Sequence, residues 1–207
     1  MENIQEKMKY LTKPGQKASA VRFCSQSFFI VEDGSLQGEA KECKKDYFLF
    51  DETGQKIGDL SLVKTKMNEA ERKWEEQDGV YIVPEEFFML VDINITQKQF
   101  HGKGLGSMLL NWATKEMRHI SDEKKTDLPM LFIRQNSLEA MAFYQKWKAE
   151  VNQGFKDDKG VFHLVENNKL GSSCYMIIKK PEPQAKYDAE RVGEYEKPAT
   201  TKDDKKL

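Results

Sequence analysis

The sequence predicts an α/β (α+β) domain in which a mixed sheet is flanked by helices, and three observations lead to this prediction. Segments rich in β-branched and aromatic residues alternate along the chain with segments of helical period. The strongest strand pattern, at residues 87–95, comes shortly before an amphipathic stretch at residues 105–117. The chain of 207 residues is also long enough to bury the core of one large domain.

The first third of the chain is predicted to consist mainly of strands. Residues 21–31 contain VRF and SFFIV and are followed by the turn residues Asp33 and Gly34. Residues 47–50 and 56–63 flank the sequence DETG, a pattern typical of a hairpin. Residues 67–76 are charged and favour a helix in the connection that precedes the next strand.

Residues 87–95, FFMLVDINI, alternate in a way that assigns each side chain to one face of a strand. The first face is predicted to carry Phe87, Met89, Val91, Ile93 and Ile95. The second face is predicted to carry Phe88, Leu90, Asp92 and Asn94. One end of the second face is therefore expected to be polar.

Two helices and three further strands are expected after this point. Leu105, Met108, Leu109, Trp112, Ala113 and Met117 form the apolar stripe of the first helix. Ala140, Phe143, Tyr144 and Trp147 form that of the second. The run PMLFI at 129–133 indicates an inner strand between the helices, and residues 161–165 and 174–178 are expected to pair as a final hairpin.

The composition of the two terminal segments divides the chain into three parts. Residues 1–17 are a polar segment in which Met8, Tyr10 and Leu11 favour one docked helical turn, and residues 18–180 form the domain. Residues 181–207 hold thirteen charges and three of the six prolines but few large apolar side chains. Such a composition favours a disordered tail or an arm that orders on a partner.

Composition and charge exclude several classes of protein. The 33 basic and 34 acidic residues give a net charge of −1, so the basic surface expected of a nucleic-acid-binding protein is not indicated. The sequence contains neither a signal peptide nor an apolar run long enough for a membrane helix. Three scattered cysteines suit neither a disulfide framework nor a metal site. We therefore expect a cytoplasmic protein without metal, nucleic acid or membrane partners.

The segment QFHGKGLGS, at residues 99–107, carries the chemical information in the sequence. Gly102, Gly104 and Gly106 alternate where the first helix begins, and the free N–H groups of a helix start attract phosphate. Lys103 adds a positive charge there. A simple turn would also account for the glycines. The spacing excludes a Walker A loop, and Ser107 occupies the place of the third glycine of a dinucleotide-binding motif.

Two motifs resemble those of the GCN5-related N-acetyltransferase (GNAT) family. HGKGLG, at residues 101–106, is similar to the family signature [Q/R]-x-x-G-x-[G/A], with His101 in place of Arg or Gln; a second register begins at Gln99. NSLEAMAFY, at residues 136–144, resembles the family's N-x-x-A-x-x-x-Y motif, with Asn136 one position early and Trp147-Lys148 in place of the usual Gly-Phe. The resemblance spans roughly residues 18–180.

The resemblance implies a mixed, mostly antiparallel sheet with a splayed cleft for acetyl-CoA. It implies that the pyrophosphate is bound by the loop and that the pantetheine pairs with the splayed strand. The cofactor-binding residues that follow are Ile93, Asn94, Ile95, His101, Gly102, Lys103, Gly104, Leu105, Gly106, Ser107 and Asn136. A capping role for Asn136 and Glu139 at the start of their helix is an equal alternative.

The resemblance also implies transfer of an acetyl group from acetyl-CoA (CoA) to a primary amine of a small molecule or peptide. Tyr144 is expected to protonate the leaving thiolate, with a core position as the alternative. Asp92 is a candidate base, with Glu85, Glu86 or a water chain as alternatives. A non-catalytic CoA-binding module and an interaction protein that acts through its tail are the other readings. Homodimers are common in the family, and the sequence leaves the acceptor and the oligomeric state open.

Overall fold

The computed structural model describes residues 3–38, 42–66, 86–124, 131–135, 138–148, 150–151, 154–156, 162–164, 174–178 and 181–199. The described strands form a nine-stranded sheet in the order β11-β1-β2-β3-β4-β5-β6-β10-β7 and a separate pair, β8-β9. The strands are β1 (Lys17–Phe23), β2 (Gln26–Gly34), β3 (Glu42–Phe50), β4 (Lys56–Lys66), β5 (Glu86–Ile95), β6 (Leu131–Gln135), β7 (Glu150–Val151), β8 (Gly154–Lys156), β9 (Phe162–Leu164), β10 (Cys174–Ile178) and β11 (Glu190–Glu196). The helices are α1 (Ile4–Leu11), α3 (Leu105–Lys124), α4 (Leu138–Gln145) and the 3₁₀ helices η1 (Lys98–Phe100) and η2 (Ala185–Tyr187).

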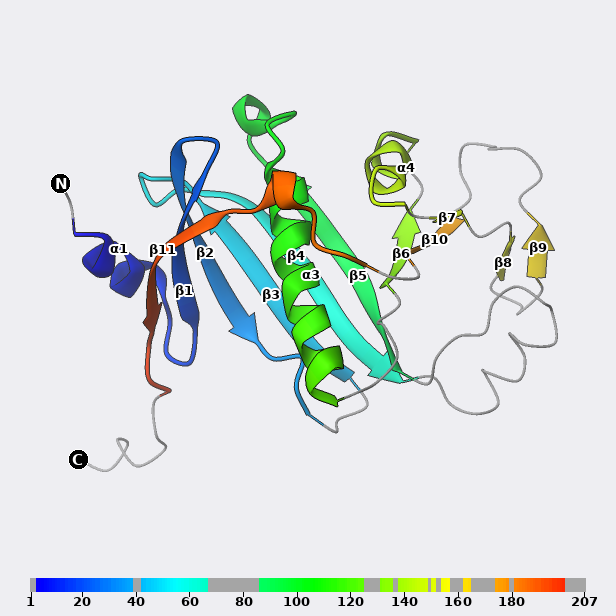
Figure 1. Ribbon diagram of the computed structural model, residues 1–207, viewed down its shortest axis with the longest axis horizontal. Coiled ribbons are helices and arrows are strands. Elements are labelled where there is room, and N and C mark those ends of the chain that lie inside the picture. The colour runs from blue at the N-terminus through cyan, green and yellow to red at the C-terminus, as the bar shows by residue number, and fades with distance from the viewer. Residues whose placement is uncertain are drawn as a thin grey trace.

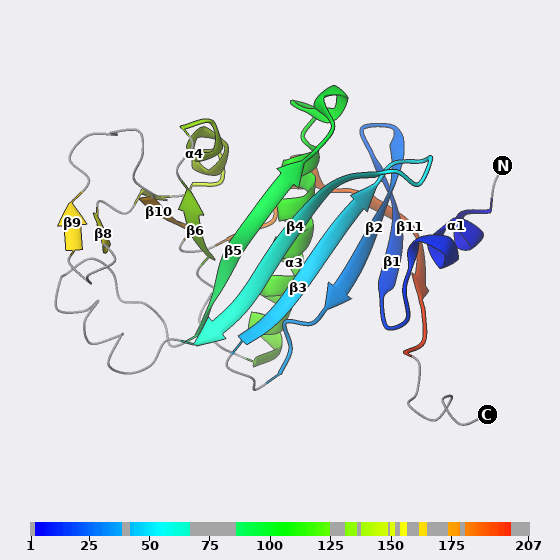
Figure 2. The same cartoon turned by 180° about the vertical axis from the view of Figure 1, so that it is seen from behind.

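The sheet is mixed and mostly antiparallel, as predicted. The β5–β6 pair is parallel, whereas every other neighbouring pair in the described sheet is antiparallel. The long helix α3 lies across one face of the strands from β2 to β5 (Figure 1), and the same strands are seen from the other side in Figure 2. The expected fold class, α/β (α+β) with a mostly antiparallel sheet flanked by helices, is confirmed.

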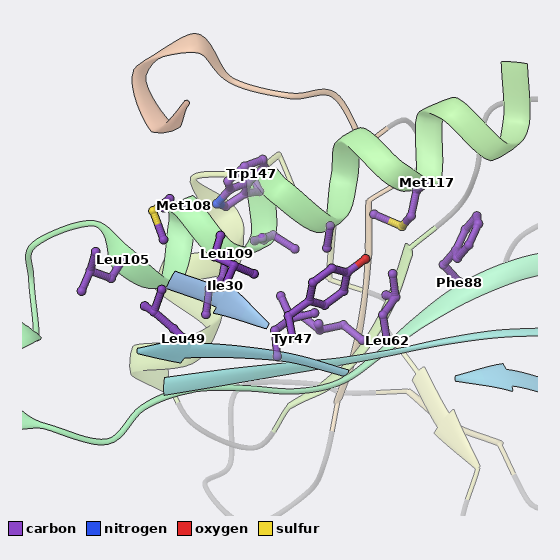
Figure 3. Close-up of a cluster of buried hydrophobic side chains, with 14 of the residues drawn as sticks. Ile30, Tyr47, Leu49, Leu62, Phe88, Leu105, Met108, Leu109, Met117 and Trp147 are labelled. Atoms are coloured by element: carbon purple, nitrogen blue, oxygen red, sulfur yellow. The ribbon is translucent and has the colours of Figure 1, made fainter. Parts of the chain in front are cut away.

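The main core lies between α3 and the sheet (Figure 3). The apolar stripe predicted for α3 is the side of the helix that packs there, and Leu105, Met108, Leu109, Ala113 and Met117 are buried. They meet apolar residues of the central strands, which include Ile30, Leu49, Leu60, Leu62 and Phe88. Burial of a single side chain of this size contributes about 2 kcal/mol, so the stripe is sufficient to hold α3 against the sheet.

A smaller core forms under α1 at the edge of the sheet. Asn3 caps this helix by accepting a hydrogen bond from Gln5 N, and Met8 is fully buried. Met8 packs in a cluster with Ala18, Ala20, Phe29 and Val31. The N-terminal segment thus forms two turns of docked helix, somewhat more than the single turn that the sequence predicts.

The predicted strand region at 21–31 is divided into two strands by a tight hairpin. Cys24 and Ser25 both have positive φ, 47° and 63°, which places the turn between β1 and β2. The predicted hairpin around residues 51–54 is confirmed as the β3–β4 turn. Asp51 accepts hydrogen bonds from the backbone N–H groups of Thr53 (2.9 Å) and Gln55 (3.0 Å).

Two predictions for the C-terminal part of the chain are wrong. Residues 181–199 are ordered, because β11 pairs antiparallel with β1 from Lys17↔Glu196 to Arg22↔Glu190 and completes an otherwise open sheet edge. The expected final hairpin is also absent among the described residues: β9 pairs with β8, while β10 pairs with β6 and β7. The predicted helix at 67–76 lies outside the described residues, as does Pro129.

Candidate functional site

The sheet opens between β5 and β6. Their parallel register covers only Phe88↔Leu131 to Leu90↔Ile133, whereas β5 continues to Ile95 along its other neighbour, β4. Beyond Leu90, the β6 side of β5 therefore has no partner strand in the described part of the chain. Backbone N–H and C=O groups on such an edge are free to bind an extended ligand.

A β-bulge at Val91 changes the faces of β5. Asp92 is opposite Ser61 and Leu90 is opposite Leu62, so Val91 is the extra residue, and its side chain is 56% exposed. Phe88, Leu90, Ile93 and Ile95 consequently all contribute to the core beneath α3. The predicted strict alternation from 87 to 95 is wrong beyond residue 90, because a bulge shifts every later side chain to the opposite face.

The loop after β5 approaches the start of α3 through two glycines in left-handed conformation. Gly102 has φ +73° and Gly104 has φ +81°, values that side chains other than glycine rarely adopt. The first hydrogen bond of α3 runs from Met108 N to Gly104 O at 2.8 Å. The N–H groups of residues 105–107 therefore lie in the first turn, where a helix has no internal acceptor for them.

A pocket of about 630 Å³ occupies the space between this loop and the end of β5. Ten of the eleven predicted cofactor-binding residues line it, from Ile93, Asn94 and Ile95 and from the run 101–107. The eleventh, Asn136, lies outside the described residues. The structure thus brings together the bulged strand, the glycine loop and the start of α3 around one volume. Partial positive charge at the helix start makes that end of the pocket suitable for a phosphate group.

His101 connects the loop to the strand. Its Nε2 donates a hydrogen bond of 2.7 Å to the carbonyl oxygen of Ile95, the last residue of β5. The side chain that replaces the family's Arg or Gln is therefore engaged with the backbone of this chain and fixes the separation between strand and loop.

The two predicted catalytic side chains are not in the pocket lining. Tyr144 is 2% exposed and belongs to the main core, where its ring meets that of Phe143 edge-on at 5.0 Å. Asp92 is exposed and lies on the face of β5 that points away from the core, because the bulge moves it off the face that carries Leu90. Phe143 is the described residue of α4 that lines the pocket.

Glu86, an alternative base, is held by two lysines. Lys64 Nζ and Lys66 Nζ each lie 2.9 Å from a carboxylate oxygen of Glu86. The hydrogen bond from Lys64, with that from Lys66 and both charges, outweighs partial burial and lowers the pKa of Glu86 to about 2. A carboxylate with so low a pKa is a poor acceptor for a proton from an amine. Glu85 lies outside the described residues.

Sequence reasoning missed several residues of the pocket. They come from the β1–β2 hairpin, the η1 turn, the end of α4 and η2, and are Phe23, Cys24, Phe100, Lys146, Lys186 and Tyr187. Lys146 is close to the second family motif and was within reach of sequence reasoning. Lys186 and Tyr187 stand in a segment whose composition resembles that of a disordered tail, so no signal in the sequence identified them.

Tyr187 has an unusual electrostatic environment for a residue at the pocket. Partial burial raises the pKa of its phenol, but a hydrogen bond with the Ser107 side chain and the charges of Lys186 and Lys146 outweigh this effect and lower the pKa from 10.0. Tyr187 therefore lines the pocket together with Lys146 and Lys186, in a region of positive potential.

The described residues contain neither a membrane-spanning helix nor a metal site of the usual kind. None of their helices is long and apolar enough to cross a membrane. The same residues include no group of three or more His, Cys, Asp and Glu side chains placed to hold a metal ion.

The open β5–β6 pair, the bulged strand and the glycine loop before α3 together form the fold that the GNAT resemblance implies. No protein-family model and no curated protein matches the sequence. The solved structures that resemble the chain include acetyltransferases.

Three of these solved structures illustrate the likeness. A Bacillus subtilis acetyltransferase in complex with CoA is 14% identical, with 66% of this chain and 76% of the other covered at a TM-score of 0.42. Nourseothricin acetyltransferase is 11% identical, with 86% and 96% covered at 0.41. A Bacillus anthracis protein in complex with acetyl coenzyme A is 15% identical, with 86% and 95% covered at 0.40.

Proposed function

We propose that the chain is an acetyl-CoA-dependent N-acetyltransferase that acts on a primary amine of a small molecule or peptide. The observation that carries this proposal is the pocket itself, which joins a helix start suited to a phosphate group to the open edge of a bulged strand. A ligand that has a diphosphate at one end and an extended arm with amide groups at the other matches both features. Acetyl-CoA is such a ligand, and its thioester supplies the acetyl group.

The diphosphate is proposed to accept hydrogen bonds from backbone N–H groups of residues 101–106, with the Ser107 hydroxyl close behind. The pantetheine is proposed to pair with Ile93–Ile95 along the edge that β6 leaves open. Backbone N–H groups there would also stabilise the oxyanion that forms from the thioester carbonyl, and donors in this role are each worth roughly 3 kcal/mol. Asn136 remains a proposed pantetheine contact.

The reaction proposed is direct attack by the neutral amine nitrogen on the thioester carbon. A C–N bond forms, the C–S bond breaks, and CoA leaves as the thiol once it has gained a proton. The amine loses a proton to a base, for which Asp92 is a candidate through a water chain because its own side chain points to the other face of β5. Tyr144 is the proposed donor to the thiolate, a role that requires its buried phenol to reach the pocket.

A second candidate function is a CoA-binding module without turnover. The burial of Tyr144 in the main core specifically favours it, because a core tyrosine supplies no proton to a leaving group. Both candidate functions use the same pocket for CoA, and they differ only in whether the acetyl group is transferred to an amine.

Two measurements test the proposal. Isothermal titration calorimetry with CoA and acetyl-CoA is expected to detect binding. The absence of heat with both ligands would refute both the acetyltransferase and the CoA-binding module. A thiol-release assay over a panel of amines is then expected to detect CoA formation. Tyr144→Phe is expected to lower kcat at least tenfold, while Tyr10→Phe, at an 87% exposed position on α1, is the matched control. Binding without turnover on every amine class would support the module.

A further inference from the structure

The C-terminal arm, defined here as residues 181–196, crosses the molecule in a way that brings it to the pocket. It passes over α3 as η2 and then continues to β11 on the far edge of the sheet (Figure 1). The arm is thus fixed at one end by pairing with β1. Its middle part lies against the first turns of α3, close to the glycine loop.

Asn111 of α3 fixes η2 in place. Its side chain is 1% exposed and uses both of its polar atoms on the arm. Oδ1 accepts a hydrogen bond of 2.6 Å from Gln184 N, and Nδ2 donates one of 2.7 Å to Asp188 Oδ1. Lys115 adds an ion pair of 2.7 Å to Asp188. One buried amide therefore holds the residues on both sides of η2 and determines where Lys186 and Tyr187 lie.

Tyr187 lies directly against the phosphate-binding end of the pocket. Tyr187 and Ser107, the third residue of α3, both line the pocket. The Tyr187 ring passes 3.9 Å from the position that a Cβ on Gly104 would occupy and stacks on Trp147 with centroids 5.7 Å apart. The ring thus lies beside the glycine loop, close to the N–H groups that are suited to a phosphate.

The charge at this end of the pocket is positive. Lys103, Lys146 and Lys186 all line it, and the Lys186 ammonium lies 4.7 Å from the ring centroid of Tyr187. The one acidic group on this part of the arm, Asp188, is already engaged by Asn111 and Lys115. An anion at this end would meet three ammonium groups, a phenol and the start of a helix.

We propose that the C-terminal arm is part of the cofactor site: Lys186 and Tyr187 bind a phosphate group of coenzyme A, and Asn111 is the residue that positions them. This inference rests on the proposed function and adds a component that the two sequence motifs do not contain. The phosphate is either the diphosphate or the 3′-phosphate, since both present the same chemistry to an ammonium group and a hydroxyl.

The test is calorimetry on the full chain with CoA and with dephospho-CoA, which lacks the 3′-phosphate. Lys186→Ala and Tyr187→Phe are each expected to raise the Kd for CoA, by about tenfold for the lysine, the usual range for a charge-assisted contact. Lys13→Ala removes the same charge at an exposed position between α1 and β1, outside the pocket lining, and is the matched control. Thermal unfolding of each variant confirms that it is folded.

The two ligands identify the phosphate. If Lys186→Ala weakens the binding of CoA but not of dephospho-CoA, Lys186 binds the 3′-phosphate. If it weakens the binding of both ligands, Lys186 binds the diphosphate. Either result supports the proposal. Asn111→Ala is expected to weaken CoA binding as Lys186→Ala does, with no further loss in the double variant, because Asn111 acts through the arm. A purely structural Asn111 would instead give additive losses.

The proposal is overturned if wild-type protein binds CoA while Lys186→Ala and Tyr187→Phe bind it within twofold of wild type. That outcome leaves the proposed function intact. Absence of CoA binding by the wild-type chain would refute both, so the two failures are distinguishable.

Discussion

Nζ of Lys45 lies 2.7 Å from Oε2 of Glu32, inside the interface between the sheet and α3. The same ammonium lies 2.8 Å from Oε1 of Glu116 on α3, and Trp112 donates a hydrogen bond of 2.9 Å to the other oxygen of Glu32. Burial lowers the pKa of Lys45, but the two carboxylates outweigh this effect and raise it above 10.5. This network links β2, β3 and α3 through one lysine.

Lys45→Met is expected to destabilise the fold by roughly 3 kcal/mol, because it leaves two largely buried carboxylates without their counter-charge. Urea unfolding measures the loss. Lys44→Met is the control: its side chain is 58% exposed beside Asp46, and such surface pairs contribute about 0.5 kcal/mol. Equal stability of the two variants would contradict the role assigned to the network.

A second prediction concerns pH and Glu86. Its pKa is about 2 in the folded chain against 4.5 in an unfolded one, so the group stabilises the fold above pH 4.5 and this contribution is lost as the pH falls toward 2. After solvent screening we expect on the order of 1 to 2 kcal/mol. Unfolding of wild type and Glu86→Gln should therefore differ at pH 7 and converge toward pH 2. A difference that does not change with pH would rule out this ion pair as the cause.

Much of the fold was predictable because its central elements have strong local patterns. The stripe from Leu105 to Met117 packs on the sheet as predicted, and Asp51 forms the predicted hairpin turn. The bulge at Val91 was not predictable, because FFMLV is apolar throughout and so does not mark an extra residue, and the shift depends on pairing with β4. Strand β11 was not predictable either, since its stability comes from backbone pairing with β1.

The site was predictable where it uses the backbone. The glycine loop was predicted from its motif, because positive φ at Gly104 limits the residue type, and residues 93–95 were expected from the family resemblance. Tyr187 was not found, because its position depends on the distant Asn111 and on no local pattern. The residue type at position 193 likewise depends on a residue far away in the sequence, because a Cβ on Gly193 would lie 3.4 Å from Cε of Met8 on α1.

The third prediction concerns Gly104, whose φ of +81° requires glycine and which lies beside Phe23 and Tyr187. Gly104→Ala is expected to cost about 1 kcal/mol of stability and to raise the Kd for CoA roughly tenfold, because the loop amides must move. Gly15→Ala is a matched control, since Gly15 has φ +80° but does not line the pocket. It should lose similar stability and keep its CoA affinity. A parallel loss of affinity in both variants would contradict a local role for Gly104.

The last prediction concerns His101, whose ring fixes the loop to the carbonyl oxygen of Ile95. His101→Ala removes this hydrogen bond, so the loop and the end of β5 can separate, and CoA should bind about fivefold more weakly by calorimetry. His101→Gln retains a side-chain N–H donor and is expected to recover part of the affinity. His119→Ala, at an exposed position toward the other end of α3, controls for loss of an imidazole. If His101→Ala binds CoA as tightly as His119→Ala does, the link to Ile95 does not set the geometry of the pocket, and the backbone conformation at Gly102 and Gly104 alone must do so.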